Sequence, residues 1–556
     1  MTDFFPTSET TSASDLVDMN AGDSVYVAPQ VVLTETTTVN FGIHDASYGY
    51  AEIFGSVTAH DAIVFDGSAL QITAIQIGET GTVSDYGGGG DAVEVDVGPY
   101  RISNLGQIIA DAGGTGIFVG GSGTIVNNGT IDANTGVSNT DANGYDATYL
   151  DNYGTIAGSS IAVSDTGGHV AFVNNYGSIV VGGPGAAVFA DSSTTEILVN
   201  VGSITGGVDL AAGSSSVNNQ GTIIGSVVNG AIDLQGASSS LTNSGTLDGD
   251  VSLGGAGDSI VNTGVINGEV GFFGATGSFL DSAHGSITGE IDCGDGGATV
   301  IAGETGGTVL GGAGNDTLRA SPTLAAANNA AQTTLDGAGG NNRLVGDGAF
   351  VTFDSGDGDG GINHIIGRLS RMSDVAGDAN NTLSYATLAG PYHSVYVDLL
   401  TRTAWMCSAA DANGAPFSDF TFEDYIRNVP NVIGSSGADT IICDNGVDII
   451  TPGGSRSVMD AGAGAGSQDT FVFTSFASST AASEDVINGF KAGVDMLDFS
   501  ALNITAANLV FSQGANHNDS NVFVEQTAGT FNAATNLTLS VHTTTATLLT
   551  ASSIAF

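Results

Sequence analysis

The chain has 556 residues, of which 84 are glycine and 41% are hydrophobic, so it has enough apolar side chains to form a core. Its 58 acidic residues against 9 Lys and Arg give a formal net charge of -49, and so few basic side chains exclude binding to a nucleic-acid backbone as a main activity. No apolar run is long enough to span a membrane.

Residues 1–30 are rich in Ser, Thr and Asp and are predicted to be a loosely attached lead-in. They have neither the basic start nor the apolar stretch of a Sec signal peptide. The three cysteines, Cys293, Cys407 and Cys443, are widely spaced and form no CxxC pair. They therefore indicate neither a disulfide framework nor a zinc site.

From residue 31 to residue 310 one pattern, Asn-x-Gly-x-Ile, recurs every 19–25 residues. Such a period is typical of a solenoid. Short β-branched runs separated by Gly, Asn and Ser exclude helical repeats and predict one coil of a parallel β-helix per unit. The glycines of the pattern are Gly106, Gly129, Gly154, Gly177, Gly202, Gly221, Gly245 and Gly264, with Gly285 closing the series without its Asn.

Each residue type has an expected role in this coil. The glycine is predicted to take a left-handed backbone conformation at a corner. The Ile or Leu two positions later is expected to point into the core. The Asn side chains, one per coil, are expected to stack into a ladder because an amide both donates and accepts hydrogen bonds.

This half of the chain resembles the passenger regions of autotransporters and filamentous adhesins, which implies a fold more than a function. Polysaccharide lyases also use the fold, but no Lys or Arg occurs between Arg101 and Arg319 to assist proton abstraction. Paired carboxylates for glycoside hydrolysis stay open as an alternative. The acids concerned, which we interpret as solvated or cation-bridging, are Asp209, Asp233, Asp248, Asp250 and Asp258.

Residues 311–319, Gly-Gly-Ala-Gly-Asn-Asp-Thr-Leu-Arg, fit the nonapeptide G-G-x-G-x-D-x-U-x. Gly312 and Gly314 allow turns that point carbonyl groups inward, and Asp316 adds an anionic oxygen. Calcium prefers six to eight such oxygen ligands. The nonapeptide resembles the calcium-binding signature of repeats-in-toxin proteins, which implies a β-roll over residues 311–470.

Further copies follow in the same frame. Asn342 stands where one copy would have its Asp, and we expect it to hold the turn and to coordinate weakly or not at all. The remaining predicted calcium ligands are Asp357, Asp359, Gly437, Asp439, Asp448 and Asp469. A segment around residues 380–430 resembles the insertions that interrupt and resume such rolls.

Residues 471–556 resemble the closing module of serralysin-type exoproteins. The similarity lies in Asp469-Thr470-Phe471-Val472-Phe473, in Asp485-Val486-Ile487 and in Gly493-Val494-Asp495-Met496-Leu497-Asp498-Phe499. It implies a small β cap and an uncleaved type I secretion signal. The chain departs from that pattern near its end, where Ser553 and Ala555 stand in place of an acidic residue.

These features predict an all-β protein with a long parallel β-helix, a Ca²⁺-binding parallel β-roll and a small capping domain. No zinc-protease or nucleophile-elbow motif accompanies them. We therefore expect a non-enzymatic, calcium-stabilised protein, secreted by a type I exporter to the surface of a Gram-negative bacterium. Its expected partner is itself, in a filament, layer or matrix. A glycan-binding adhesin and a polysaccharide-modifying enzyme are the alternatives.

Overall fold

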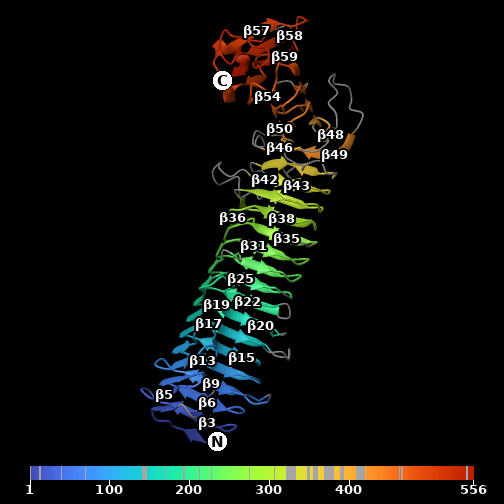
Figure 1. The fold of residues 1–556 in the computed structure, drawn as a ribbon. Coiled ribbons are helices and arrows are strands. Elements are labelled where there is room, and N and C mark those ends of the chain that lie inside the picture. Colours follow the sequence, from blue (N-terminus) through green and yellow to red (C-terminus); the bar gives the residue numbers. More distant parts are fainter. Residues whose placement is uncertain are drawn as a thin grey trace. The chain divides into compact units, whose positions relative to one another are not determined.

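The protein is described from a computed structural model, and its regular secondary structure is almost entirely β-strand (Figure 1). It divides into two compact units, Met1–Gly289 and Glu290–Phe556. No helix in the described part of the chain has the length and apolarity needed to cross a membrane. All residues are described except 1, 12–13, 39, 69, 141–146, 168–169, 192–194, 212, 227, 229, 274–275, 306, 321–332, 347–350, 355–360, 368–380, 389–393, 408–419, 463, 465–466 and 546–548.

Unit 1 is a parallel β-helix in which each coil contributes to three columns of strands. The first column contains β1 (Asp3–Phe4), β4 (Ser24–Val27), β7 (Tyr50–Ile53), β10 (Thr73–Ile77), β13 (Tyr100–Asn104), β16 (Gly123–Asn127), β18 (Thr148–Asn152), β20 (Val170–Asn175), β23 (Thr195–Asn200), β26 (Ser216–Asn219), β29 (Ser240–Asn243), β32 (Ser259–Asn262) and β35 (Ser278–Asp281).

The second column contains β2 (Glu9–Thr11), β5 (Val32–Glu35), β8 (Ser56–Ala59), β11 (Thr82–Asp85), β14 (Gln107–Ile109), β21 (Ser178–Val181), β24 (Ser203–Thr205), β27 (Thr222–Ile224), β30 (Thr246–Asp248), β33 (Val265–Asn267) and β36 (Ser286–Ile287). The third contains β3 (Val17–Met19), β6 (Phe41–Asp45), β9 (Asp61–Phe65), β12 (Asp91–Val95), β15 (Thr115–Val119), β22 (Val188–Ala190), β25 (Val208–Leu210), β28 (Ile232–Leu234), β31 (Val251–Leu253) and β34 (Val270–Phe272). The long strands β17 (Thr130–Asn139) and β19 (Thr155–Asp165) run through both columns.

Apolar side chains at the predicted inward positions fill the interior of these coils. Ile108, Ile131 and Ile156, each two residues after a repeat glycine, are 0% exposed. They lie in register on neighbouring strands, so each packs on the next coil. Burying one such side chain contributes roughly 1.5–3 kcal/mol. The predicted all-β fold class and the inward row are confirmed.

The Asn ladder is also confirmed. Asn104, Asn127 and Asn152 are 0% exposed, and the Nδ2 group of each donates to the Oδ1 atom of the Asn one coil further on, at 2.8 Å. The same contact continues from Asn175 through later coils and ends at Ser282. Since every amide both donates and accepts, the ladder satisfies buried polar groups without adding charge.

The prediction of a left-handed conformation for the repeat glycines is wrong. Gly177 and its equivalents are not among the residues with positive φ. The constraint is instead the distance to the neighbouring coil, because a Cβ atom on Gly177 would lie 2.1 Å from the carbonyl oxygen of Gly154. Glycine is required here because two backbones approach each other closely.

Residues 1–30 differ from the predicted lead-in because they form the first coil. Strand β1 pairs with β4, β2 with β5 and β3 with β6, all in parallel. Val17 and Met19 are buried. The abundance of Ser and Thr suggested a loose segment, but alternation of buried and exposed residues is sufficient for a short strand of a coil.

Unit 2 is a roll with two main columns of strands, and it begins at Glu290 rather than at the predicted residue 311. Near its start, Gly294, Gly297 and Gly312 turn the chain with φ values of 66°, 81° and 81°. One column contains β38 (Ala298–Ala302), β41 (Thr317–Ala320), β43 (Arg343–Val345), β45 (His364–Ile366), β49 (Phe420–Arg427), β47 (Ser394–Asp398), β51 (Thr440–Ile442), β53 (Val458–Asp460), β55 (Asp485–Phe490) and β59 (Leu537–Thr543).

The other column contains β37 (Ile291–Asp292), β40 (Thr308–Leu310), β42 (Thr333–Asp336), β44 (Val351–Asp354), β46 (Thr382–Ser384), β50 (Asn431–Ile433), β52 (Ile449–Thr451), β54 (Thr470–Val472), β56 (Met496–Asp498) and β60 (Ile554–Ala555). A short strand, β39 (Glu304–Thr305), also belongs to this unit. The parallel pairs continue through β54–β56 and β56–β60, so the roll extends beyond the predicted limit at residue 470.

Two antiparallel additions interrupt this pattern. The first, within the predicted insertion, joins β47 to β48 (Thr403–Cys407) and β48 to β49. The second joins β57 (Leu509–Gln513), β58 (Asp519–Val524) and β59. Three short 3₁₀ helices, η2 (Ser500–Leu502), η3 (Ala506–Asn508) and η4 (Ala551–Ser553), complete the C-terminal part.

The close approach of the coils predicts that Gly177→Ala destabilises unit 1. The new Cβ would overlap the carbonyl oxygen of Gly154, and we expect the free energy of unfolding to fall by about 1–3 kcal/mol. Gly182→Ala is the matched control, since the nearest atom to its Cβ lies 3.9 Å away. Urea unfolding followed by circular dichroism compares the two, and equal midpoints would refute this explanation of the repeat glycine.

Candidate calcium centre

Three buried aspartates stand one above the other in unit 2, each directly before a strand of the β52–β54–β56 column. Asp448, Asp469 and Asp495 are at most 1% exposed. The backbone N–H of Asp448 donates to Oδ1 of Asp469, and that of Asp469 to Oδ1 of Asp495, both at 3.2 Å. The carboxylates of Asp469 and Asp495 thus bridge to the coil before them, whereas that of Asp448 accepts from the N–H of Asp444 at 2.9 Å. We call these three residues the aspartate column.

Burial makes the negative charge of this column unfavourable. The pKa of Asp448 is raised to about 8, first by burial and then by the charges of Asp444 and Asp469. Burial also raises the pKa of Asp469, to about 6, and raises the pKa of Asp495. Backbone N–H groups favour the charged forms but do not offset burial. A cation would remove the mutual repulsion.

The atoms in the column fit calcium. Oδ2 of Asp469 is buried and has no hydrogen-bond partner in the described part of the chain. Ligand atoms of Cys443, Asp448 and Asp469 lie within 4.8 Å of one another. Burial, and then the charge of Asp448, raise the pKa of the Cys443 thiol well above its usual value, which disfavours the thiolate form that binds soft metals. Carboxylate oxygens therefore remain as the ligands, and these are what calcium prefers.

The second row of acidic residues in the roll precedes the strands β51, β53 and β55. Asp439 and Asp485 occupy this row, with Ser457 between them. Asp439 is fully hydrogen-bonded, since it accepts from the N–H groups of Val395 and Ser435 and from the Ser435 hydroxyl, at 2.9, 2.8 and 2.5 Å. Oδ2 of Asp485 has no such partner, and burial raises its pKa to about 8.

The nonapeptide aspartate has no acidic neighbour in its own row. Oδ1 of Asp316 accepts from the N–H of Ala298 at 2.6 Å, and its Oδ2 is buried without a partner. On the next coil, Asn342 accepts from the N–H of Asp316 at 2.8 Å. The Nδ2 group of Asn342 donates to the carbonyls of Gly337 and Gly339, at 2.6 and 2.9 Å. The Asn342 amide therefore forms hydrogen bonds with the loop carbonyl groups of its own repeat.

The predicted ligands thus separate into several groups. Asp448 and Asp469 are brought together, whereas Asp439 precedes a strand of the other column. Gly312 has the expected left-handed φ of 81°, and Gly314 is needed because its Cβ would lie 2.1 Å from the backbone nitrogen of Gly297. The N–H of Gly437 donates to the hydroxyl of Ser435. The predictions for Asp357 and Asp359 lie outside the described residues.

Sequence reasoning missed Asp495 and Asp485 as members of these rows, because both lie in the segment interpreted as a cap. The available signal was local. Each is followed by an apolar residue two positions later, Leu497 and Ile487, which are both 0% exposed. The same spacing relates Asp469 to Phe471. Had this spacing been followed past residue 470, it would have identified both aspartates.

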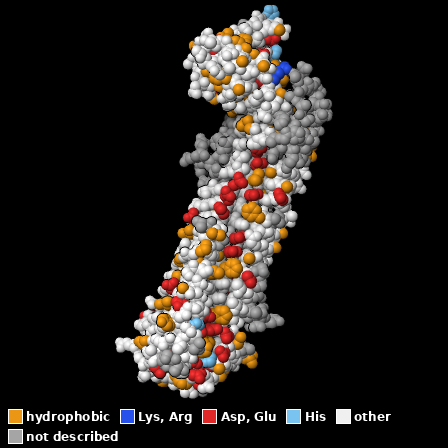
Figure 2. All heavy atoms as spheres, in the orientation of Figure 1, with side chains coloured by type: hydrophobic (Ala, Val, Ile, Leu, Met, Phe, Trp, Pro, Cys, Tyr) orange, Lys and Arg blue, Asp and Glu red, His pale blue; other side chains and the backbone are white. Residues whose placement is uncertain are grey.

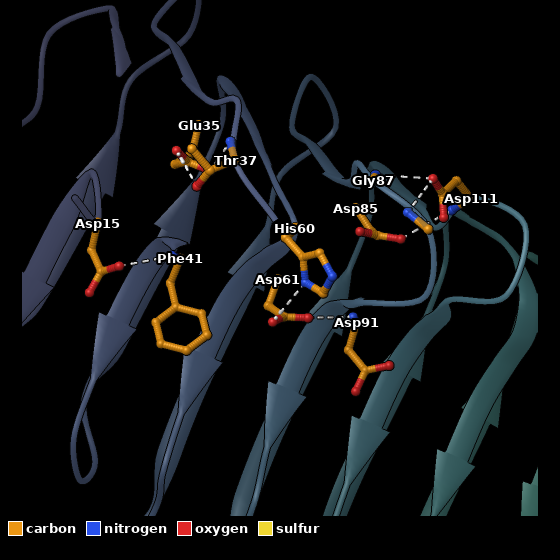
Figure 3. Close-up of polar contacts among 11 residues, drawn as sticks. Asp15, Glu35, Thr37, Phe41, His60, Asp61, Asp85, Gly87, Asp91 and Asp111 are labelled. Atoms are coloured by element: carbon orange, nitrogen blue, oxygen red, sulfur yellow. Dashed lines mark hydrogen bonds and ion pairs between the residues drawn. The ribbon is translucent and has the colours of Figure 1, made fainter. Parts of the chain in front are cut away.

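The N-terminal coils contain acidic side chains that bind backbone groups (Figure 3). Asp61 accepts from the N–H of Asp91 at 2.8 Å, and Asp111 accepts from the N–H groups of Gly87 and Gly88 at 3.1 and 2.9 Å. These carboxylates join neighbouring coils.

A second group of metal-binding side chain types, Asp15, Asp18 and His44, also lies in these coils. Nδ1 of His44 is 3.7 Å from Asp15 Oδ2 and 3.9 Å from Asp18 Oδ1. Its mixed nitrogen and oxygen donors differ from the all-oxygen set that calcium prefers.

Comparison with known proteins gives one finding. The family model described as Peptidase M10 serralysin C terminal matches residues 425–552. This part of that family is a non-catalytic, calcium-binding repeat domain of secreted proteins, and in this chain the match includes the entire aspartate column. No match to the chain was found among curated proteins.

Calcium binding at the aspartate column predicts that Asp469→Asn weakens it. The substitution removes one negative charge and the unpartnered oxygen's ability to act as an anionic ligand, so calcium affinity should fall by roughly tenfold or more. Asp498→Asn is the control, because Asp498 lies in the same unit and its Oδ1 accepts from the N–H of Ser500. Isothermal titration calorimetry measures both, and equal affinities would exclude Asp469 as a ligand.

The raised pKa values predict a pH dependence without calcium. An acid whose pKa is raised in the folded state is protonated on folding, so its contribution is full below the unfolded pKa and is lost as pH rises through the folded pKa. Unit 2 in chelator should therefore lose stability from about pH 4 to about pH 8, the range set by ordinary aspartate and by Asp448. Calcium should abolish the loss. A stability that rises over this range in chelator would contradict the prediction.

Proposed function

We propose that the protein is a calcium-stabilised, secreted structural component that assembles with copies of itself into a filament, layer or matrix. The observation that carries the proposal is the outer edge of the first coil. In the described chain β1, β2 and β3 pair only with β4, β5 and β6, so one side of each strand has unpaired backbone groups. Such an edge is a template for a strand of another chain.

Charge determines when assembly can occur. The chain carries a formal net charge of -49, and acidic side chains are spread over the face shown in Figure 2, where basic ones are few. Copies of such a molecule repel one another. Calcium would reduce this repulsion and would also fold unit 2, so assembly is expected where calcium is plentiful. Joined through unlike surfaces, identical chains form rings or open filaments.

The secretion route follows from the same charge and from the family match. A repeat domain of the serralysin type is found in secreted proteins, and we propose a type I exporter of a Gram-negative bacterium as the route. In a calcium-poor cytoplasm the aspartate column would repel itself and keep unit 2 open for export. Calcium outside binds only the folded form and so stabilises it.

An adhesin that binds glycans is the second candidate, favoured by exposed aromatic side chains on unit 1. Tyr153 stacks on Tyr176 of the next coil with ring centroids 4.8 Å apart, and Tyr149 stacks on Phe172 at 4.7 Å. The polar pair Asp151 and Asn174 belongs to the same strands, β18 and β20. Aromatic rings beside hydrogen-bonding groups suit a sugar polymer, and loss of binding to a cell-surface polysaccharide in Tyr176→Ala would support this candidate.

An enzyme acting on polysaccharides is the candidate from another class. Asp209 and Asp233 are register partners on neighbouring strands, and burial followed by the charge of Asp233 raises the pKa of Asp209. A carboxyl with a raised pKa beside a second carboxylate suits glycoside hydrolysis. Release of sugar from a polysaccharide, abolished by Asp209→Asn, would support this candidate.

The edge proposal predicts that Thr10→Lys impairs assembly. Thr10 is exposed on β2, and lysine on an open edge opposes strand addition. The protein concentration needed for assembly in calcium should rise by about tenfold, which corresponds to about 1.4 kcal/mol. Thr242→Lys is the matched control, since Thr242 is equally exposed on β29, which is paired on both sides.

Light scattering and electron microscopy measure this assembly. Wild-type protein and Thr242→Lys should form filaments or sheets in calcium and dissolve in chelator. Wild-type protein that remains monomeric in calcium at high concentration would refute self-assembly and favour the adhesin. Equal assembly of the two variants would show that the first-coil edge is not the contact surface.

A further inference from the structure

One buried acidic side chain in unit 1 has no hydrogen-bond partner that would account for its burial. Glu196 on β23 is 1% exposed, and neither of its carboxylate oxygens has a hydrogen-bond partner among the described residues. It stands in an inward-facing row in register with Ala171 and Thr148 on β20 and β18. A buried polar group without a partner is costly, and a buried charge far more so.

Other polar side chains accompany Glu196 inside the same coils. Asn139 and Asp165 end the strands β17 and β19, are 3% and 5% exposed, and are register partners. The Nδ2 group of Asn139 donates to Oγ1 of Thr148 at 2.8 Å and to Oδ2 of Asp165 at 3.3 Å. The charge of Asp165 acts on Glu196 and, after burial, helps to raise its pKa. Asp165 is thus an acidic side chain whose charge Glu196 experiences.

Asn139 and Asp165 interrupt a run of apolar residues on the neighbouring coils. On the coils before Asn139 the position is Val119 and Val95, and on the coils after Asp165 it is Ala190 and Leu210. All four of these side chains are at most 1% exposed. The same row contains the buried Asp45 several coils earlier. Since apolar residues separate them, Asn139 and Asp165 form a local polar pair and not part of a continuous ladder.

Protonation of Glu196 alone would not give its carboxyl group hydrogen-bond partners. A carboxylic acid has an O–H donor and a carbonyl acceptor, and both would stay buried without partners, at about 1–3 kcal/mol each. A cation contacts carboxylate oxygens directly and balances both negative charges. The available atoms are carboxylate, amide and hydroxyl oxygens, which hard divalent cations prefer over soft ones.

We propose that Glu196 and Asp165 bind a calcium ion inside the β-helix of unit 1, with oxygens of Asn139 and Thr148 as further candidate ligands. This site is separate from the aspartate column, which lies in unit 2. The ion would connect β18 and β19 of one coil to β23, which lies two coils further on. It would make part of unit 1 depend on calcium, although the Asn ladder in the same unit does not.

The test is Glu196→Gln, which keeps the shape of the side chain and removes its charge. If Glu196 binds calcium, the full-length variant should bind one ion fewer than wild type, measured by equilibrium dialysis with atomic absorption. If Glu196 is merely protonated, glutamine replaces it without effect on the number of ions, and the proposal is overturned. Glu35→Gln is the control, because Glu35 is 0% exposed and accepts from the N–H and hydroxyl of Thr37 at 2.7 and 2.9 Å.

A second measurement on the wild-type chain does not depend on how the variant folds. Calcium should slow hydrogen exchange of residues 195–200 by about tenfold or more, as expected for ligand-linked stabilisation. Asp469→Asn, which affects only the column in unit 2, should leave this slowing unchanged. Exchange of residues 195–200 that is the same with and without calcium would refute the proposal, whatever the behaviour of unit 2.

Discussion

The structure depends on one recurring contact, in which a side chain at the corner of a coil hydrogen-bonds to the next coil. Parallel strands bury their flat inner faces, but the corners leave polar groups that each need a partner. In unit 1 the contact is made by Asn127 and its equivalents, and in unit 2 by the carboxylates of Asp469 and Asp495, which accept from the preceding coil. Both arrangements hold successive coils in register. They differ in charge.

This difference distinguishes the Asn ladder, whose hydrogen bonds are complete, from the aspartate column, whose charge a cation would balance. An amide donates and accepts, so a stack of Asn residues is neutral and complete. A carboxylate only accepts, so a stack of Asp residues accumulates negative charge in a buried place. Asn342 shows the effect of an amide in place of a carboxylate within unit 2. In this repeat, which lacks the Asp, the amide donates hydrogen bonds to the carbonyls of Gly337 and Gly339. A secreted protein can use such a column to fold only where calcium is present.

Periodic features were predictable from the sequence, whereas features that depend on neighbouring coils were not. The spacing of the repeat glycines predicted the coils, and the Asn two positions before each glycine predicted the ladder. The reason for glycine was missed, since the short distance from Gly177 to Gly154 arises only when two coils are stacked. Likewise, Asp439 and Asp448 are close in sequence but precede strands of different columns. Glu196 and Asp165 gave no repeat signal, because the residues in register with them on the adjacent coils are not acidic.

The most direct test of this account replaces the column with amides. In the triple variant Asp448→Asn, Asp469→Asn and Asp495→Asn, the charge is removed and hydrogen-bonding side chains of the same shape remain. Thermal unfolding of unit 2, followed by circular dichroism with calcium and with chelator, measures the consequence. The account predicts that the variant stays folded in chelator and gains little stability from calcium. A variant that unfolds in chelator, or that calcium stabilises as strongly as it does the wild type, would contradict it.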